Sequence, residues 1–361
     1  MIRKFKQVFK LIVYTLIVNI LLFVFLEGIC SLALSIRAAM SRTDFAYKDE
    51  SYFARYDELL GWTNIPNFEQ KDLFAPGVYF KTNSQSFRND KDFSINIPKG
   101  KIRIICCGDS YTLGFDVNND QTWCQQLASI DKRLETINMG QAGYGVDQAY
   151  LWYMRDGRKF EHNVHIFAFI IDDFDRMKHD LRGVYGKPTL KVVNGKLVVN
   201  NVPVPKRGIF FRKLIYNAFF DTIRLRQFLD LAIEKLRLSP QKTLLTDDEV
   251  KKVALKIFDD LERVNKAKNS TLVLVNLPVC YSDPNVEPWR KWLKVETKKR
   301  GIVYIDLYED YLQLPYAEVE PLFIPEDGHY SVRGNRFIAQ ILYKKLFSSG
   351  GLLHKLYLDK M

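Results

Sequence analysis

The sequence has 361 residues, of which 47% are hydrophobic. This apolar content excludes a disordered chain and is enough for one large α/β domain with an appendage, or for two domains. The formal net charge is +11, but no basic run is interleaved with aromatic residues as in nucleic-acid-binding proteins, so we expect no nucleic-acid partner.

The first predicted element is an apolar stretch, Leu11–Leu34, in which only Asn19 and Glu27 are strongly polar. As a helix it would extend about 36 Å, enough to cross the roughly 30 Å hydrocarbon core of a bilayer. A cleaved signal peptide is the alternative, but its apolar region would be only about 7–15 residues long, and Ser35–Met40 is a poor cleavage site. We therefore predict an uncleaved transmembrane signal anchor within residues 1–40, with the lipid bilayer as its partner.

The charges around this stretch predict its topology. Four basic residues precede it, and these are Arg3, Lys4, Lys6 and Lys10. Because cytoplasmic flanks are enriched in Lys and Arg, we expect the N-terminus in the cytoplasm and everything after residue 40 outside it. Arg37 and Arg42 on the far side reduce the asymmetry, which leaves a cytoplasmic-facing domain as the alternative.

Residues 41–100 are aromatic and polar, with turn signals at Pro66-Asn67 and Pro76-Gly77 but no strong period. We interpret them as a juxtamembrane lead-in to a main domain at residues 101–350.

In the main domain, predicted strands alternate with predicted helices. Five apolar runs bounded by Gly, Pro or Asp predict strands buried on both faces. They are Ile102–Cys107, Thr136–Met139, Val164–Ile171, Thr271–Pro278 and Ile302–Asp306. Helical spacing of apolar residues marks Asp147–Phe160, Asp247–Lys266, Pro288–Arg300 and Ser331–Phe347. The alternation predicts an α/β domain with a parallel sheet and right-handed crossovers.

One segment, Thr189–Val204, interrupts the alternation. Two β-branched runs flank Asn194-Gly195 there, which is a strong signal for a two-residue hairpin turn. We predict a small β-hairpin insertion at about residues 183–210.

The cysteines and histidines indicate neither a disulfide framework nor a metal site. The cysteines are Cys30, Cys106, Cys107, Cys124 and Cys280, an odd number with no C-x-x-C spacing. His162 and His165 come close together before a predicted strand, but no third ligand type is nearby. We therefore expect no metal and no cofactor.

Candidate chemistry gathers where the predicted strands end, which is the edge where open α/β sheets bind ligands. Ser110 follows the first strand and is expected to begin a helix, near backbone amides able to stabilise an oxyanion. After the second strand, three glycines would let the backbone approach a substrate closely, and these are Gly140, Gly143 and Gly145. Asp172 and Asp173 follow the third strand.

A serine is a poor nucleophile without a base that takes its proton. Of the five histidines, only His329 combines a position at a strand-end loop with an adjacent acid. Asp327, two residues earlier, would hold the imidazole ring and stabilise the imidazolium.

The blocks GDSYTLG and NMGQAGYG, with a terminal DGH before a helix, resemble the motifs of the SGNH (GDSL) hydrolases. The resemblance spans about residues 60 to 348, and with the anchor it is similar to the membrane-anchored bacterial branch. It implies a three-layer flavodoxin-like fold, with Ser110 as nucleophile and His329 as base. It also implies an oxyanion hole formed by the amides of Ser110 and Gly143 and by an asparagine side chain.

The chain departs from this pattern at Asp172, which occupies the position expected for the asparagine. A carboxylate repels an oxyanion, so Asp172 would serve only when protonated, with Asp173 as the like-charge neighbour that favours protonation. Otherwise the hole has two donors, at a cost of roughly 10²–10³ in rate. The family often places the acid three residues before the histidine, where this chain has Glu326, but we prefer Asp327.

These features predict an extracytoplasmic serine esterase or acyl hydrolase that acts on O-acyl groups of cell-envelope glycan through an acyl-enzyme on Ser110. An O-acyltransferase would use the same acyl-enzyme, with a sugar hydroxyl as acceptor. The Asp172 substitution motivates a further hypothesis, a catalytically impaired glycan-binding or assembly protein.

Overall fold

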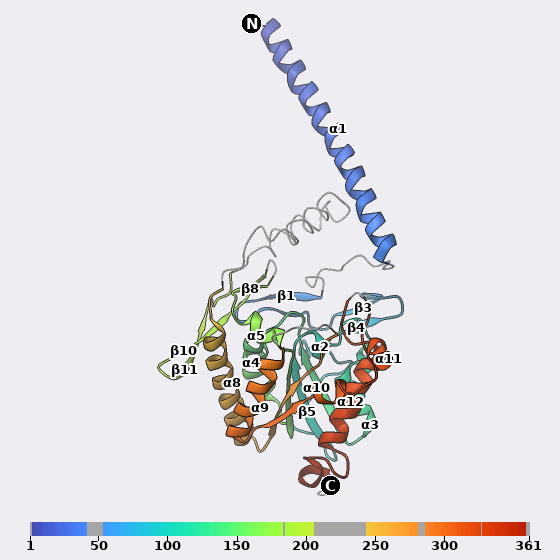
Figure 1. Ribbon diagram of the computed structural model, residues 1–361. Helices are drawn as coiled ribbons and strands as arrows, with labels where there is room; N and C mark the ends of the chain where they lie inside the picture. Colours follow the sequence, from blue (N-terminus) through green and yellow to red (C-terminus); the bar gives the residue numbers. More distant parts are fainter. Residues whose placement is uncertain are drawn as a thin grey trace. The chain divides into compact units, whose positions relative to one another are not determined.

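The computed structural model describes residues 2–41, 53–182, 185–205, 243–280, 286–325 and 327–358. Helix α1 (Ile2–Ser41) belongs to one compact unit, and the sheet with the elements around it belongs to another (Figure 1). Glu326, Arg42 and the outer ends of the predicted hairpin insertion lie outside the described residues.

Helix α1 contains the predicted apolar segment. Its stretch Lys6–Ala33 is long and apolar enough to cross a membrane, and most of its residues are exposed. One polar side chain within it is satisfied locally, since Asn19 Nδ2 donates to the Thr15 carbonyl at 2.7 Å. A helix of this kind meets the requirements of a membrane anchor and of a signal sequence alike.

The second unit is built on a five-stranded parallel sheet. Its strands are β5 (Ile102–Gly108), β6 (Leu134–Gly140), β7 (Val164–Phe169), β12 (Thr271–Asn276) and β13 (Val303–Asp306). Their order is β13-β12-β7-β5-β6, which is the flavodoxin-like order, and the predicted parallel sheet is confirmed. Every residue of β5, β6 and β7 is buried, which explains why these runs are mostly apolar, and the buried Arg103 of β5 pairs with Glu135 of β6.

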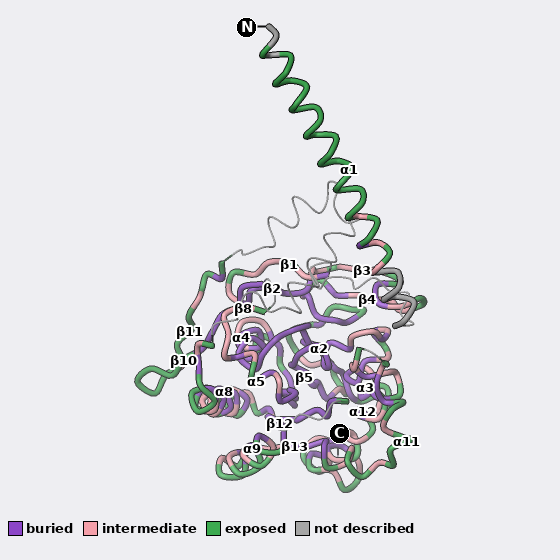
Figure 2. The backbone as a smooth tube through the Cα atoms, turned by 45° about the horizontal axis from the view of Figure 1, so that its top comes forward, coloured by how far each residue is buried: buried purple, intermediate pink, exposed green. Residues whose placement is uncertain are grey.

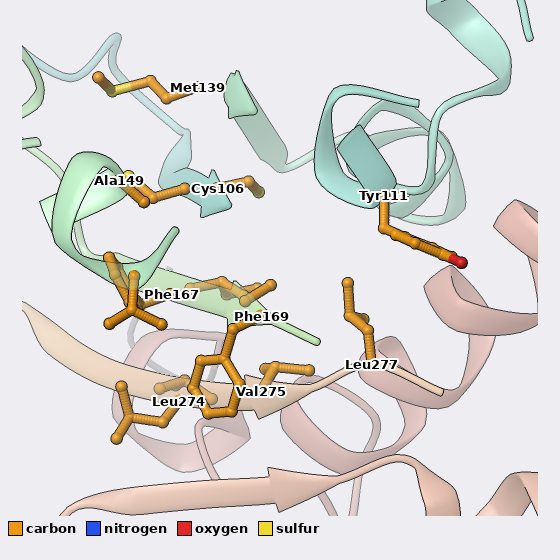
Figure 3. Packing of buried hydrophobic residues seen from close by; sticks show 14 of the residues in the cluster. Cys106, Tyr111, Met139, Ala149, Phe167, Phe169, Leu274, Val275 and Leu277 are labelled. Atoms are coloured by element: carbon orange, nitrogen blue, oxygen red, sulfur yellow. The ribbon is translucent and has the colours of Figure 1, made fainter. Parts of the chain in front are cut away.

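Helices cover both faces of this sheet and make three layers (Figure 1). Helix α12 (Val332–Leu346) packs on α3 (Trp123–Ile130) on one face. Helices α4 (Val146–Arg155), α8 (Asp247–Ala267) and α9 (Val286–Arg300) lie on the other, as right-handed crossovers require for this strand order. Figure 3 shows the side chains between the layers, among them Met139, Phe167 and Leu274.

Shorter elements complete the second unit. The antiparallel pairs are β1 (Ala54–Asp57) with β2 (Gly61–Asn64), β3 (Glu69–Lys71) with β4 (Tyr79–Lys81), β8 (Leu181–Arg182) with β9 (Tyr185–Gly186), and β10 (Thr189–Val193) with β11 (Lys196–Asn200). The short helices are α2 (Ser110–Leu113), α5 (Asp172–Arg176), α10 (Tyr308–Tyr311) and α11 (Tyr316–Val319), with single turns at Asn119–Gln121, Gly157–Lys159, Glu320–Leu322 and His354–Leu358.

The predicted helix Asp147–Phe160 is shorter than expected, because α4 ends at Arg155 and Gly157 begins a separate turn. Gly157 packs so closely on Tyr153 and Met139 that a Cβ there would lie within 3 Å of both side chains. A continuous helix with a side chain at this position would not fit.

Residues 53–100 contribute to the core of the second unit. Strand β2 is buried along its length (Figure 2), and Leu60, Trp62 and Phe87 belong to the main hydrophobic cluster of the unit. Trp62 Nε1 donates to the Ala142 carbonyl at 2.9 Å, in the loop after β6. The segment predicted as a lead-in thus covers the loops at the carboxyl edge of the sheet; its strands of three and four residues are too short to show a period.

The predicted hairpin is confirmed. Asn194 and Gly195 both have positive φ, at 50° and 73°, which is the requirement of a type I′ turn. Leu190 is buried against the core near α8, whereas Val193 and Val198 on the opposite face of the ribbon are exposed.

Two of the three glycines at the end of β6 and in the loop after it pack closely within the protein. A Cβ on Gly140 would lie 2.0 Å from the Leu113 backbone nitrogen, and one on Gly145 would lie 2.7 Å from Asp147 Oδ1. These two glycines therefore allow close packing of α2 and α4 at this edge of the sheet.

Gly140→Ala is expected to lower the free energy of unfolding by about 1–3 kcal/mol, because the new methyl group meets the rigid backbone of α2. Gly350→Ala is the matched control, since a Cβ there would have no neighbour within 4 Å. Denaturant unfolding followed by tryptophan fluorescence measures both. Equal stability of the two variants would contradict the close packing of α2 on β6.

Candidate active site

Ser110, His329 and Asp327 form a chain of hydrogen bonds at the carboxyl edge of the sheet. His329 Nε2 lies 2.8 Å from Ser110 Oγ, and His329 Nδ1 lies 2.6 Å from Asp327 Oδ2. The serine and the histidine are 219 positions apart in the sequence, so the fold brings them together. The arrangement has the geometry of a nucleophile, a base and a residue that orients the base.

The Ser110 turn is held by caps at both ends of α2. The Asp109 side chain accepts a hydrogen bond from the Tyr111 amide at 2.9 Å, and Gly114 ends the helix in a left-handed conformation. Ser110 is the first residue of the helix, where a backbone amide has no acceptor within the helix. Its side chain and amide therefore both face the edge of the sheet where substrates bind in this architecture.

The His329 turn precedes α12 and closes on itself. The Ile324 amide donates to the His329 carbonyl at 2.8 Å, and the Gly328 amide donates to the Ile324 carbonyl at 2.9 Å. Gly328 has φ of 81°, a value that favours glycine. Asp327 also accepts a hydrogen bond from the His329 amide at 3.3 Å. Asp327 lies two residues before His329, and this spacing lets its carboxylate contact both the backbone amide and the ring of His329.

Two aromatic rings hold the His329 imidazole, and sequence reasoning did not identify either of them. Phe115 stacks on it with ring centroids 4.9 Å apart, and Tyr111 lies at 4.8 Å. The Tyr111 hydroxyl also donates to the Gly328 carbonyl at 3.0 Å. Both rings come from the segment that carries Ser110, so nucleophile and base are positioned by the same turn.

Arg88 is a second residue that the sequence did not single out. Its buried guanidinium donates to the Leu113 carbonyl at 2.8 Å and also to the carbonyls of Gly114 and Val117. A cation here satisfies the carbonyls at the C-terminal end of α2. Arg88 lies in the segment that was predicted to be only a lead-in, where nothing local marks it.

Asp116, in the loop that Arg88 holds, faces Asp327. Burial and then the charge and hydrogen bond of Asp327 raise the pKa of Asp116 to about 7. Burial alone would raise the pKa of Asp327 as well, but the hydrogen bonds and charge of His329 and the hydrogen bond of Asp116 together outweigh burial and lower it. The two carboxyls therefore divide their roles, with the proton on Asp116 and the charge on Asp327.

On the other side of Ser110, Arg176 joins two buried carboxyls. One of its Nη atoms lies 3.2 Å from Asp109 Oδ2 and 2.5 Å from Asp173 Oδ1, and it donates to the Tyr144 carbonyl at 2.8 Å. Burial would lower the pKa of Arg176, but the two carboxylates outweigh it and raise the pKa. One guanidinium thus ties together the ends of β5, β6 and β7.

Asp173, not Asp172, is the buried acid of the third strand end. Burial and then the charge of Asp109 raise the pKa of Asp173 well above its usual range, while Arg176 opposes the shift. Asp172 is the first residue of α5 and is half-buried. The expectation that Asp173 serves to protonate Asp172 therefore has the roles reversed, because Asp173 is the more deeply buried of the two.

The other expected oxyanion donor is the Gly143 amide. Gly143 has φ of 73° in the loop after β6, and among the described residues no backbone or side-chain group accepts a hydrogen bond from its amide. Asn138, the asparagine at the end of β6, is engaged elsewhere, since its Nδ2 donates to the Thr112 carbonyl at 3.0 Å.

His162 and His165 are buried away from this edge, at the start of β7. His162 Nδ1 lies 2.7 Å from the Phe160 carbonyl, and Asn265 lies 3.1 Å from a ring nitrogen of each histidine. Burial lowers the pKa of both. No group of three metal-binding side chains is gathered among the residues that the structure describes.

Comparison with known proteins gives structural matches at low sequence identity. No protein-family model and no curated protein matches the sequence. A lipolytic protein of the G-D-S-L family from Desulfitobacterium hafniense is 14% identical, with a TM-score of 0.38, over 68% of this chain and 100% of that one. A member of the same family from Veillonella parvula is 13% identical, with a TM-score of 0.40, over 69% and 99%. A GDSL-like lipase from Bacteroides thetaiotaomicron is 10% identical, with a TM-score of 0.38, over 70% and 90%.

Arg176→Met is expected to lower the free energy of unfolding by about 3–5 kcal/mol near neutral pH, because it leaves two buried carboxyls without their cation. The free energy of unfolding of this variant falls further as the pH rises above about 4, since its folded state holds a proton on Asp173 that the unfolded chain releases. Denaturant unfolding at several pH values measures it.

Adding Asp173→Asn to the Arg176→Met variant should recover part of the stability and flatten the pH dependence. Arg133→Met, which removes an exposed guanidinium that pairs with Asp131, is the control and should cost under about 1 kcal/mol. A free energy of unfolding of Arg176→Met that does not change with pH would contradict the assignment of the proton.

Proposed function

We propose that this protein is a membrane-anchored serine esterase whose nucleophile is Ser110. The observation that carries the proposal is the chain of hydrogen bonds from Asp327 through His329 to Ser110. Three residue types of a serine hydrolase lie at hydrogen-bond distance, in the correct order and at the edge of the sheet where this architecture binds ligands. The His329 side chain keeps partial access to solvent, whereas Ser110 beside it is buried.

The reaction would begin with transfer of the Ser110 proton to His329 Nε2 as Oγ attacks the ester carbonyl. Asp327 would stabilise the imidazolium that forms. The amides of Ser110 and Gly143 would stabilise the oxyanion of the tetrahedral intermediate. His329 would then give its proton to the leaving alcohol, which leaves an ester between Ser110 and the acyl group.

Deacylation repeats these steps with a new acceptor. His329 would take a proton from water in hydrolysis, or from a sugar hydroxyl in O-acyl transfer, and return it to Ser110. Both outcomes use the same residues, and they differ only in the acceptor that reaches the acyl-enzyme. Because Asp172 replaces the expected asparagine, the oxyanion hole would have two donors, the amides of Ser110 and Gly143. Such a hole supports a slow enzyme, and a slow enzyme favours a reactive ester substrate over an amide.

The substrate class that we propose is an O-acylated glycan of the cell envelope. The apolar helix α1 supports a membrane location, and the basic residues before it support a cytoplasmic N-terminus with the catalytic unit outside. An esterase anchored in this way would have access to the polysaccharides of the cell envelope as substrates.

A second candidate function is glycan binding without catalysis, which Asp172 favours because a carboxylate at the oxyanion position opposes acyl transfer. A fluorophosphonate probe distinguishes the two. Covalent labelling of Ser110 supports the esterase, whereas glycan binding that survives Ser110→Ala in a chain that resists labelling supports the binding protein.

Ser110→Ala is expected to lower turnover of p-nitrophenyl acetate by the full chain in detergent about 10³-fold or more, because the acyl-enzyme cannot form. Ser129→Ala, on the exposed end of α3, is the control and should keep the native rate. Turnover that does not change in Ser110→Ala would exclude Ser110 as nucleophile.

The anchor has its own test. Mass spectrometry of the protein isolated from membranes should give the full mass of 42.2 kDa, because an uncleaved anchor keeps its first residues. A mass lowered by about 30–40 residues, together with release into the soluble fraction, would show a cleaved signal peptide.

A further inference from the structure

The loop after α2 brings a second carboxyl to the Asp327–His329 pair. Asp116 has φ of 60°, a left-handed conformation that Asp adopts more readily than most residues. Phe115, directly before it, stacks on the His329 ring at 4.9 Å. Arg88 donates to the carbonyls of Gly114 and Val117 on either side of it. The loop is therefore held in the one conformation that directs Asp116 toward Asp327.

The groups that face Asp116 determine its protonation state. They are the Asp327 carboxylate, His329 and the guanidinium of Arg88. Two carboxyls within hydrogen-bond distance share one proton more readily than both ionise. Asp327 has a stronger reason to stay charged, because it also accepts hydrogen bonds from the amide and the ring of His329. The shared proton consequently belongs on Asp116.

We propose that Asp116 is a positioning residue of the candidate active site, whose carboxylic acid donates a hydrogen bond to Asp327 and fixes that carboxylate on His329. The inference rests on the proposed function of Ser110. During catalysis the Asp116 proton stays where it is, and only the proton between Ser110 and His329 moves. The pair Asp116–Asp327 keeps a single negative charge throughout, which stabilises the imidazolium without a second, repelling charge.

This role makes the site sensitive to alkaline pH. Burial and Asp327 raise the pKa of Asp116 to about 7, so the donor is present below that pH and is lost above it. Once ionised, Asp116 repels Asp327 and no longer holds it. Asparagine at position 116 offers an amide donor at every pH, whereas alanine offers none.

The test compares the rate at which a fluorophosphonate labels Ser110 in the full chain between pH 6 and pH 9. The native protein should match Asp116→Asn at pH 6 and approach Asp116→Ala at pH 9, with about tenfold between the two variants at each pH. Asp120→Asn, an exposed acid four positions later, is the matched control and should follow the native protein throughout. Asp116→Ala that follows the native protein at every pH would overturn the inference.

A second measurement does not depend on nucleophilic activity. The Nδ1 proton of His329, observed by NMR, should show a transition between pH 6 and pH 9 in the native protein that reports the ionisation of Asp116, and this transition should be missing in Asp116→Asn. Labelling that is absent in the native protein would refute the proposed function, and the NMR signal would then still decide the role of Asp116. A signal that titrates equally in both proteins would refute the inference about Asp116. Labelling of Ser110 in the same protein would still support the proposed esterase.

Discussion

The packing of the four-residue helix α2 against the backbone of β6 is the constraint on which the candidate site depends. Gly140 has no side chain, and a Cβ there would lie 2.0 Å from the Leu113 nitrogen. Because the helix sits directly on the strand, Ser110 lies beside the loop that contains Gly143. A larger residue at 140 would move the nucleophile away from the amide expected to stabilise its oxyanion.

Helix α2 also organises the base. Tyr111 and Phe115 hold the imidazole of His329, and the Tyr111 hydroxyl binds the turn that contains it. Four residues are too few to form a stable helix alone. Its stability comes from its caps at Asp109 and Gly114 and from the partners of its last carbonyls, Arg88 and Asn138. The precision of the serine–histidine contact is therefore set by side chains that would never touch a substrate.

Two arrays of charged side chains flank this helix, one buried and one partly exposed, and each has more carboxyls than permanently charged cations close to them. Behind Ser110, Arg176 faces Asp109 and Asp173. In front of it, Asp116 and Asp327 face His329, which is cationic only when it holds a proton. In both arrays an acid with a raised pKa removes the excess negative charge. A negative field at Ser110 would oppose the formation of an oxyanion, so neutralising one acid on each side favours the chemistry that we propose.

The sequence was sufficient to predict features that local patterns encode. Apolar runs marked the strands of the sheet, Asn194-Gly195 marked a hairpin, and the short motifs around Ser110 and His329 marked the residues that the fold brings together. Arg88 could not be found in this way, because its three carbonyl partners identify it only once residues 88 and 113–117 have been folded against each other.

The role of Asp116 could not be predicted from the sequence, for a physical reason. Asp116 lies six positions after Ser110, and an acid in a loop is ordinarily a solvated charge. Its raised pKa arises from contact with a residue more than 200 positions away and from burial that no local pattern reports. The same holds for the reversal between Asp172 and Asp173, which are identical in type and adjacent in sequence. Only the first turn of α5 decides which of the two carboxyls is buried beside Arg176 and which stays half-buried.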